Sequence, residues 1–469
     1  MSNRNNSDNL GDWKIASTGK MMSYSFGFIL SLYLLIAYNS LIFYFYEVEV
    51  GLEVELVSLA IILYTIWVII SSPILGYITD RPFKFSKKWG FRTPWIIISA
   101  IPALIFYYLL YVPPEIDAKS NSWLFFWYLL ITSCLFGTFI MIFREHHEGG
   151  FPNHFREDFE RRRASAIAFI FPGIILFFLS ILPLLIIKYG DKSTFALTAF
   201  ISVIIMAICL IFLIPGIYES DEAKKRNLQG YEDSKRLSFL KMLKISLKQK
   251  NFRISLIATT LVNIAGALSY ASGIYFFKDV LKLPLYLSVF PTIVFFIVLM
   301  ITVPYWATFA RKHGNANTFI LGILLSGIAY LPFLWITTLE EAIVYSILQG
   351  LSASCYTVMS LPIIADCYDE VTLVCEKHQE ATLLGIRTIS MRSAIIFQAL
   401  IIAAIHIITG YNQDPNAIQT PLAVWGVRVH RALIPMILCF IAFFVMLFWY
   451  DLKGSKVNEL KASLRLKGL

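Results

Sequence analysis

Charged residues are scarce in this sequence. They make up 15% of its 469 residues, against about a quarter in soluble globular domains, whereas hydrophobic residues make up 57%. This balance excludes a soluble globular domain and indicates a polytopic membrane protein. The formal charge of +9 comes from cations gathered in the loops between apolar runs. That pattern is typical of a protein held beside anionic lipid headgroups, so we exclude nucleic acid as a partner.

Several functional signatures are also missing. The sequence has no glycine-rich loop ending in Lys-Ser or Lys-Thr that would bind ATP phosphates, and no motif indicates an enzyme or a cofactor. Its six cysteines lie mostly inside apolar runs, so we expect no disulfide framework. Cys367 and Cys375 are predicted to share one short loop with His378, but a zinc site needs a fourth ligand and tighter spacing. We therefore expect no metal.

Twelve apolar runs are present, each about 20 residues long, the length that crosses a hydrocarbon core of about 30 Å. They are 22–46, 54–78, 94–112, 122–143, 164–187, 194–218, 254–277, 285–309, 316–335, 342–365, 381–408 and 431–450. The first is too long for a signal peptide, so we expect it to be retained as a span. The sequence thus predicts an all-α membrane protein.

The longest polar connection, 219–253, separates six runs from six. We therefore expect an N-terminal tail 1–21, a six-helix bundle 22–218, the linker 219–253, a second bundle 254–450 and a C-terminal tail 451–469. Apolar residues at helical spacing predict an amphipathic helix on the inner leaflet within the linker; they are Leu237, Leu240, Leu243 and Leu247. Loops rich in Lys and Arg place both termini in the cytoplasm of a cell-membrane protein.

The turn between the second and third runs carries its own pattern. Gly76 would let a neighbouring helix approach, and Asp80 follows on nearly the same helical face, beside Arg81 and Arg92 as candidate ion-pair partners. We expect this turn to act in gating. Pro304 precedes a basic pair by the same seven residues that separate Pro73 from Asp80-Arg81, which indicates two parallel repeats.

These residues resemble a known family. Gly76-x-x-x-Asp80-Arg81, a basic run and Trp89-Gly90-Phe91-Arg92 resemble the major facilitator superfamily, and the Trp-Gly to Pro94-Trp95 stretch resembles its glycoside/pentoside/hexuronide:cation symporter branch, which includes the melibiose carrier. The resemblance implies two six-helix bundles, a central site between them and alternating access.

At several positions where the resemblance implies a family carboxylate, this sequence has another residue. Val68 and Ser72 occupy the positions of the two cation-binding carboxylates of the second helix, and Leu32 and Arg144 those of the sugar-binding carboxylates. The basic residue of the eleventh helix is kept as Arg392. Sodium coupling and galactoside specificity are therefore not expected, and a proton is favoured over sodium as the coupling cation.

Ionisable groups inside apolar runs are costly, so each is a functional candidate. We predict that Arg392 faces the cavity. Arg387 lies about 140° away on the same helix, so it either pairs with Asp366 or Asp369 at the rim or contributes to function. Arg144 either binds substrate or snorkels to the headgroups. We expect the neighbouring Glu145–Glu148 segment to be a solvated loop.

The remaining candidates are weaker. Glu145 and His146 could carry a proton, and His406 is expected at the membrane interface. Neutral side chains that could bond sugar hydroxyls or a neighbouring helix are Tyr38, Asn39, Asn263 and Gln398.

These features predict a monomeric secondary transporter of a small molecule. Because no carboxylate is expected to neutralise the arginines, the cavity should be net positive, which favours a uronide or another sugar acid over a neutral glycoside. Two alternatives remain open. One is a lysophospholipid transporter of the same superfamily, its acyl path lined by aromatic residues. The other is a receptor or scaffold that kept the fold without transport.

Overall fold

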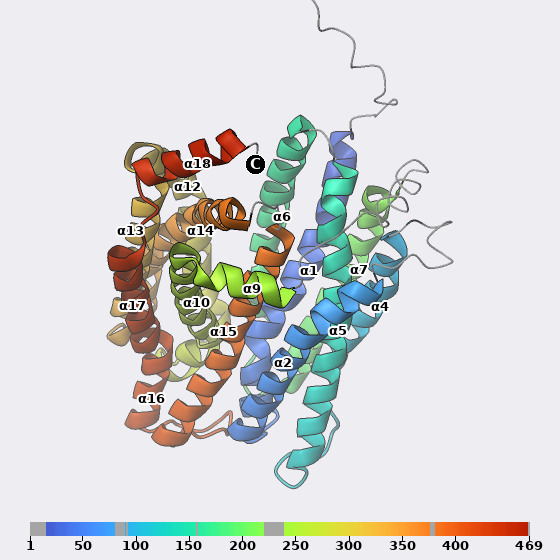
Figure 1. Ribbon diagram of the computed structural model, residues 1–469. Coiled ribbons are helices and arrows are strands. Elements are labelled where there is room, and N and C mark those ends of the chain that lie inside the picture. The colour runs from blue at the N-terminus through green and yellow to red at the C-terminus, as the bar shows by residue number, and fades with distance from the viewer. Residues whose placement is uncertain are drawn as a thin grey trace, which may run out of the picture.

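The computed structural model of the protein describes residues 16–79, 90, 92–155, 158–219, 239–375 and 380–467. Every element in this part of the chain is helical (Figure 1). Within it, eleven helices are long and apolar enough to cross a membrane, and the shorter helix Thr93–Leu109 supplies the twelfth. The predicted all-α fold with twelve membrane helices is therefore confirmed.

The first half of the protein consists of six membrane helices that pack mainly with one another. They are α1 (Thr18–Tyr44) with the π-helical turn η1 (Phe45–Glu49), α2 (Val54–Thr79), α4 (Thr93–Leu109), α5 (Ser122–His154), α6 (Asp158–Ile186) and α7 (Lys192–Ile217). Several helices continue beyond the apolar runs that predicted them. α5, for example, runs about three turns past residue 143.

The second half begins after the linker. Its helices are α9 (Phe239–Lys248), α10 (Lys250–Ala271), α11 (Gly273–Tyr275), η2 (Phe276–Val280), η3 (Leu285–Ser288), α12 (Val289–His313), α13 (Asn315–Tyr330), η4 (Leu331–Leu334), α14 (Leu339–Cys375), α15 (Glu380–Thr409), α16 (Pro421–Arg428), η5 (Val429–Leu433), α17 (Ile434–Trp449) and α18 (Ser455–Lys467). We call the end where α1 begins and α18 lies the tail side, at the top of Figure 1, and the opposite end the far side.

One turn is repeated in the two halves. η1 closes with hydrogen bonds from the N–H of Val50 to Phe45 O and of Leu52 to Tyr46 O. η2 closes in the same way, from Leu281 to Phe276 O and from Leu283 to Phe277 O. The start of each turn (45 and 276) and the helix prolines (73 and 304) are separated by the same 231 residues. The two halves therefore share a structural repeat at the far end of their first helix.

The two halves share a core only at part of their height. The larger cluster of buried apolar residues joins Phe45 of the first half to Phe276 and Tyr411 of the second, and its second-half members come from the middle or far ends of their helices. A smaller cluster, which includes Phe252 and Leu460, belongs to the second half and α18. The described contacts thus hold the halves together most firmly toward the far side.

The predicted linker helix corresponds to α9. Leu243 and Leu247 pack against the core cluster of the second half, beside α10 and α15. This face of α9 therefore contacts protein. Leu237 lies outside the described residues, and no side-chain position is described for Leu240.

Candidate substrate site

Arg392 of α15 brings a positive charge to the boundary between the halves. Its guanidinium donates a hydrogen bond to the sulfur of Met141, on α5 of the first half. Tyr64 of α2 lies close enough to interact with its charge, and α15 packs against α2 along the same boundary. A thioether is a weak acceptor, so this bond alone does not satisfy a guanidinium with five N–H donors.

Arg144 reaches the same region but is already paired. Its Nε lies 2.5 Å from Glu148 Oε1, one turn further along α5, and the two side chains are 35% and 40% exposed. The charges of Arg144, Glu145 and Glu148 all act on Arg392. The predicted net positive charge of this region is therefore wrong, because two arginines stand among two glutamates and the four formal charges cancel.

Glu145 points from α5 toward α2. Ser72 donates a hydrogen bond to its Oε1, and a Cβ added to Gly76 would lie 3.2 Å from its Oε2. Gly76 thus allows the close approach that its sequence position suggested, with Glu145 as the neighbour. The resemblance places one of the family's cation-binding carboxylates at Ser72 of α2. Here the nearby carboxylate is that of Glu145, on α5.

The prediction that residues 145–148 form a solvated loop is wrong. α5 continues to His154, and other helices cover its extra turns. His146 is 1% exposed and stacks on Trp95 of α4 with ring centroids 5.9 Å apart. His147 is fully buried and stacks on Tyr24 of α1 at 4.4 Å, where its Nε2 lies 2.9 Å from Tyr24 O. Both imidazoles pack within the first half.

The neutral polar candidates are spread over both halves. Tyr38 donates to Ser133 at 3.1 Å inside the first half, so its hydroxyl is engaged there. Asn39 on α1 and Asn263 on α10 are half-buried. Gln398 on α15 is 3% exposed, and its Oε1 has no hydrogen-bond partner among the described residues. Gln398 lies on the same helix as Arg392, about one and a half turns toward the far side.

Part of the predicted gating turn can be located. Asp80 and Arg81 lie outside the described residues. The backbone N–H groups of Arg92 and Thr93 both donate to Glu219 Oε1, at 2.7 and 3.4 Å, so this carboxylate holds the start of α4. The guanidinium of Arg92 lies against α5, where a Cβ added to Gly149 would meet its Nη1. Arg92 therefore packs within the first half.

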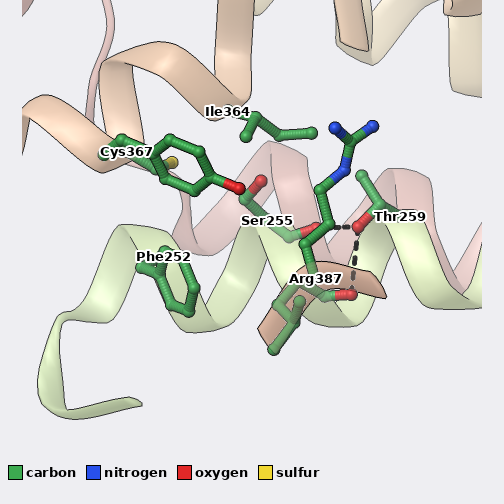
Figure 2. Close-up of a pocket in the computed structure, with 8 residues that line it drawn as sticks. Phe252, Ser255, Thr259, Ile364, Cys367 and Arg387 are labelled. Atoms are coloured by element: carbon green, nitrogen blue, oxygen red, sulfur yellow. Dashed lines mark hydrogen bonds between the residues drawn. The ribbon is translucent and has the colours of Figure 1, made fainter. Parts of the chain in front are cut away.

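Arg387 and Asp366 lie in the second half with different neighbours. The Asp366 carboxylate is 3.5 Å from the Lys461 ammonium of α18, which is its ion-pair partner. Pairing of Arg387 with the other carboxylate considered, Asp369, stays a prediction. Figure 2 shows Arg387 extending from α15 between Ile364 of α14 and Thr259 of α10. It lines a small pocket together with Phe252, Ser255, Leu256, Thr259, Ile364, Cys367 and Tyr368. Arg387 thus faces the interior of the second half, away from the boundary that Arg392 occupies.

Cysteine placement also differs from the sequence prediction. Cys367 and Cys375 belong to α14 rather than to a loop, and Cys367 is buried 3.7 Å from the Tyr450 hydroxyl. All six cysteines are free thiols, and the described residues contain no group of three potential metal ligands.

A buried polar cluster at the far side escaped the sequence analysis. Glu47 of η1 accepts hydrogen bonds from His406 of α15 and Tyr275 of α11, which joins the halves. His406 is 2% exposed and lies near the far end of α15, covered by protein. His406 in turn contacts His430 of η5. Two carboxylates just after the first run, one histidine near the end of the eleventh run and one just before the twelfth were the available sequence signals.

Comparison with known proteins identifies the family. The family described as MFS/sugar transport protein matches residues 16–454. The chain belongs to this family. It is therefore a member of the major facilitator superfamily (MFS) and a multi-pass membrane protein, and the expected superfamily is confirmed.

Solved structures of MFS-type transporters are similar in fold. The nucleoside transporter NupG has a TM-score of 0.59 at 14% identity, over 92% of this chain and 100% of that one. A D-xylose–proton symporter has a TM-score of 0.58 at 13% identity, over 92% and 98% of the two chains. A point mutant of the peptide transporter POT has a TM-score of 0.62 at 13% identity, over 94% of each chain. At this identity the likeness concerns the fold alone.

Two curated relatives of this MFS protein are more limited matches. The sodium-dependent lysophosphatidylcholine symporter 1-A of Danio rerio is 21% identical over 350 residues, 66% of this chain and 62% of that protein. The uncharacterized symporter sll1374 of Synechocystis is 32% identical over 99 residues, 20% of this chain and 18% of that one. The alignments thus span less than two thirds of both relatives.

Proposed function

We propose that this protein is a secondary transporter that binds a small organic anion between its halves, with Arg392 as the principal ligand. The sugar acids and uronides of the glycoside/pentoside/hexuronide branch are the favoured class. The observation that carries the proposal is the position of Arg392, on the second half, against Met141 of the first. A carboxylate offers a guanidinium the bidentate acceptor that a thioether does not.

The neighbouring charges suggest how a proton would be coupled to the anion. Arg144 is neutralised by Glu148, and Glu145 also acts on Arg392. A proton on Glu148 would release Arg144 and leave the site with a net positive charge, which an anionic substrate would then balance. We therefore assign the proton to Glu145 or Glu148. The ring of His146 is a poorer candidate, because it stacks on Trp95 of α4 and not at the boundary between the halves. Asn263 and Gln398 remain candidates for substrate hydroxyl groups.

The alternating-access cycle follows from the same geometry. We infer that the tail side is cytoplasmic, because α1 begins there, α18 lies there, and the cations at the start of α6 (Arg161, Arg163) and the end of α12 (Arg311) lie there too. We also infer that the described state is closed at the far side by the shared core. Substrate would then reach Arg392 from the cytoplasmic side in this state. Rocking of the halves about the Met141–Arg392 contact would expose the site to the other side.

Ligand binding can be tested with purified protein in detergent. A ligand at about 100 times its dissociation constant adds about 2.7 kcal/mol to the stability of the folded state. We expect galacturonate, glucuronate or a related sugar acid to raise the melting temperature, and Arg392→Gln to abolish the increase. Arg311→Gln, at the exposed tail-side end of α12, removes the same charge elsewhere and should respond like the parent. Equal stabilisation of the parent and Arg392→Gln would overturn the assignment.

Coupling is tested by uptake into proteoliposomes. An inward proton gradient should drive accumulation of the anion, and Glu148→Gln should uncouple uptake from that gradient. Replacing the proton gradient with a sodium gradient should have no effect. Uptake that follows sodium would show that transport here is sodium-dependent, as the name of the Danio rerio relative says of that protein.

A lysophospholipid is the second candidate substrate. The curated relative from Danio rerio carries that name, and large apolar side chains are exposed along the helices on either side of the boundary between the halves. On α6 they are Phe169, Ile170, Ile174 and Phe178, and on α12 they are Phe290, Ile297, Met300 and Ile301. An acyl chain could lie along such a flank while Arg392 binds the phosphate. Stabilisation by lysophosphatidylcholine and not by sugar acids would favour this candidate. Binding without flux would indicate a receptor.

A further inference from the structure

The far side contains a set of ionisable side chains that takes no part in the proposed substrate site. Glu47 and His430 are 0% exposed, and His406 is 2% exposed. Glu47 belongs to the first half, and the two histidines to the second. Glu47 and His430 both lie in π-helical turns, η1 and η5, which are rare elements often found at functional sites.

These residues form a continuous hydrogen-bonded chain. Glu47 Oε1 lies 2.6 Å from His406 Nδ1, and His406 Nε2 lies 3.2 Å from His430 Nε2. His430 Nδ1 lies 2.6 Å from Ser272 Oγ, and the Ser272 hydroxyl is 2.5 Å from Leu268 O. The chain therefore runs from a carboxylate of the first half to a backbone carbonyl of the second.

The hydrogens of this chain have a complete arrangement when both imidazoles are neutral. The Leu268 carbonyl already accepts the backbone N–H of Ser272 at 2.9 Å, so the Ser272 hydroxyl can donate to His430 Nδ1. His430 then donates through Nε2 to His406, and His406 through Nδ1 to Glu47. Every link is formed, but the three residues keep the negative charge of Glu47. One additional proton on the chain removes that charge, and the Ser272 hydroxyl then turns to Leu268 O.

We infer that Glu47, His406 and His430 form a proton-binding site that closes the far side of the transporter. With the additional proton the three residues have a net charge of zero, which suits their complete burial. Without it, the negative charge of Glu47 remains buried, although every link can still form. Because the Glu47–His406 link joins the two halves, loss of the proton favours their separation at the far side.

Other polar groups surround the site on every element that packs against it. On η1 and the end of α1 these are Glu49 and Tyr44, and from α11 Tyr275 donates to Glu47 Oε2 at 2.5 Å. After α15, Tyr411 stacks on His406 at 4.2 Å and donates to Asp279 of η2 at 2.7 Å. Burial raises the pKa of Asp279, and Lys278, 3.3 Å away, opposes this. On η5, Arg431 acts on His430.

The hydrogen bonds around Glu47 differ in whether they depend on protonation. Tyr275 donates to Glu47 whatever the protonation of the carboxylate, so this bond does not respond to pH. The three links that lead from Glu47 through His406 and His430 to Ser272 do respond, because each contains a titratable partner. The site therefore acts as a one-proton switch on the equilibrium between far-side-closed and far-side-open states. It is independent of the substrate proposed for Arg392.

Distances between the halves measure this equilibrium directly. Spin labels at Lys192→Cys and Ile418→Cys, in protein whose six native cysteines are replaced, would sit on exposed residues of the first and second halves at the far side. We expect a short distance at pH 5.5 and a growing population of a longer one toward pH 8.5. The ratio of the two should change by up to about tenfold per pH unit, the limit for one proton.

Glu47→Gln is the decisive variant. Its amide can donate to His406 and accept from Tyr275, so it reproduces the protonated pattern without a titratable carboxylate, and the short distance should persist at every pH. Glu49→Gln is the matched control, since Glu49 bonds the Gly190 N–H within its own half at 3.1 Å, and it should keep the pH response of the parent. A parent distance that ignores pH, a Glu47→Gln variant that still responds, or an equal loss of response in Glu49→Gln would each overturn the inference.

Discussion

Gly51 and Lys282 occupy the same place in the two copies of one turn. Each follows a π-helical turn at the far end of the first helix of its half, and each has a positive φ, 82° for Gly51 and 56° for Lys282. Among the described non-glycine residues, Lys282 alone adopts such a φ. The repeat has thus kept the backbone conformation in both halves, although glycine remains in only one.

This pairing predicts unequal responses to substitution. Gly51→Ala adds a Cβ in open space, so the change acts through the backbone alone and should destabilise the protein by about 1 kcal/mol. Lys282→Gly removes a strained, exposed side chain while loosening the unfolded chain, so its effect should lie within about 0.5 kcal/mol of zero. Melting temperatures in detergent compare the two. Equal destabilisation by both changes would contradict the shared turn.

A glycine contact between α1 and α7 gives a second prediction. A Cβ on Gly216 would overlap the backbone of Ser23 and Tyr24, which cannot rotate away as a side chain could. Gly216→Ala should therefore separate the two helices and cost about 1–3 kcal/mol. Gly173→Ala in α6, which meets nothing within 4 Å, is the control and should be neutral or stabilising, because alanine favours a helix. Thermal unfolding of both variants decides the matter.

The carboxylate of Glu219 supports the start of α4 and can be tested in the same way. It accepts two backbone N–H groups that begin the helix, a favourable place for negative charge. Glu219→Ala should cost about 1–2 kcal/mol and Glu219→Gln less, since the amide oxygen can still accept. Glu115→Ala, an exposed carboxylate in the loop after α4, should change nothing measurable. A melting temperature unchanged in Glu219→Ala would show that the contact does not hold the helix.

Periodicity and hydropathy predicted much of this architecture. Long apolar runs predicted the membrane helices, because twenty apolar residues in a row have few other solutions. Helical geometry separated Arg392 from Arg387 by about 140°, and the structure has one at the boundary between the halves and the other inside the second half. Both inferences depend only on local sequence.

Packing between distant segments was beyond the same reasoning. Hydropathy ends the fourth run at residue 143, yet α5 continues because Tyr24 and Trp95 cover His147 and His146. Nothing in the sequence joins Glu47 to His406 across 359 residues, since no periodicity relates the ends of two distant runs. The pairing of Arg144 with Glu148 likewise depended on α5 remaining helical where a loop was expected.

The contact between Arg392 and Met141 allows a last test of the substrate site that needs no knowledge of the substrate. Met141→Glu would place a carboxylate beside the guanidinium and form an ion pair across the boundary between the halves. Such a pair competes with an anionic substrate, so binding of sugar acids should fall at least tenfold. Met141→Gln has nearly the same size without the charge and should bind within about threefold of the parent, the variation that a lost weak acceptor allows.

Titration of the two variants separates electrostatics from shape. If the competition is electrostatic, acid should restore binding to Met141→Glu as the new carboxylate takes up a proton, while Met141→Gln should show the pH dependence of the parent. Equal losses in the two variants would instead mean that the side chain at position 141 contributes packing, and that the anion does not bind at Arg392. Calorimetric binding curves at several pH values, on protein that retains its melting temperature, distinguish these outcomes.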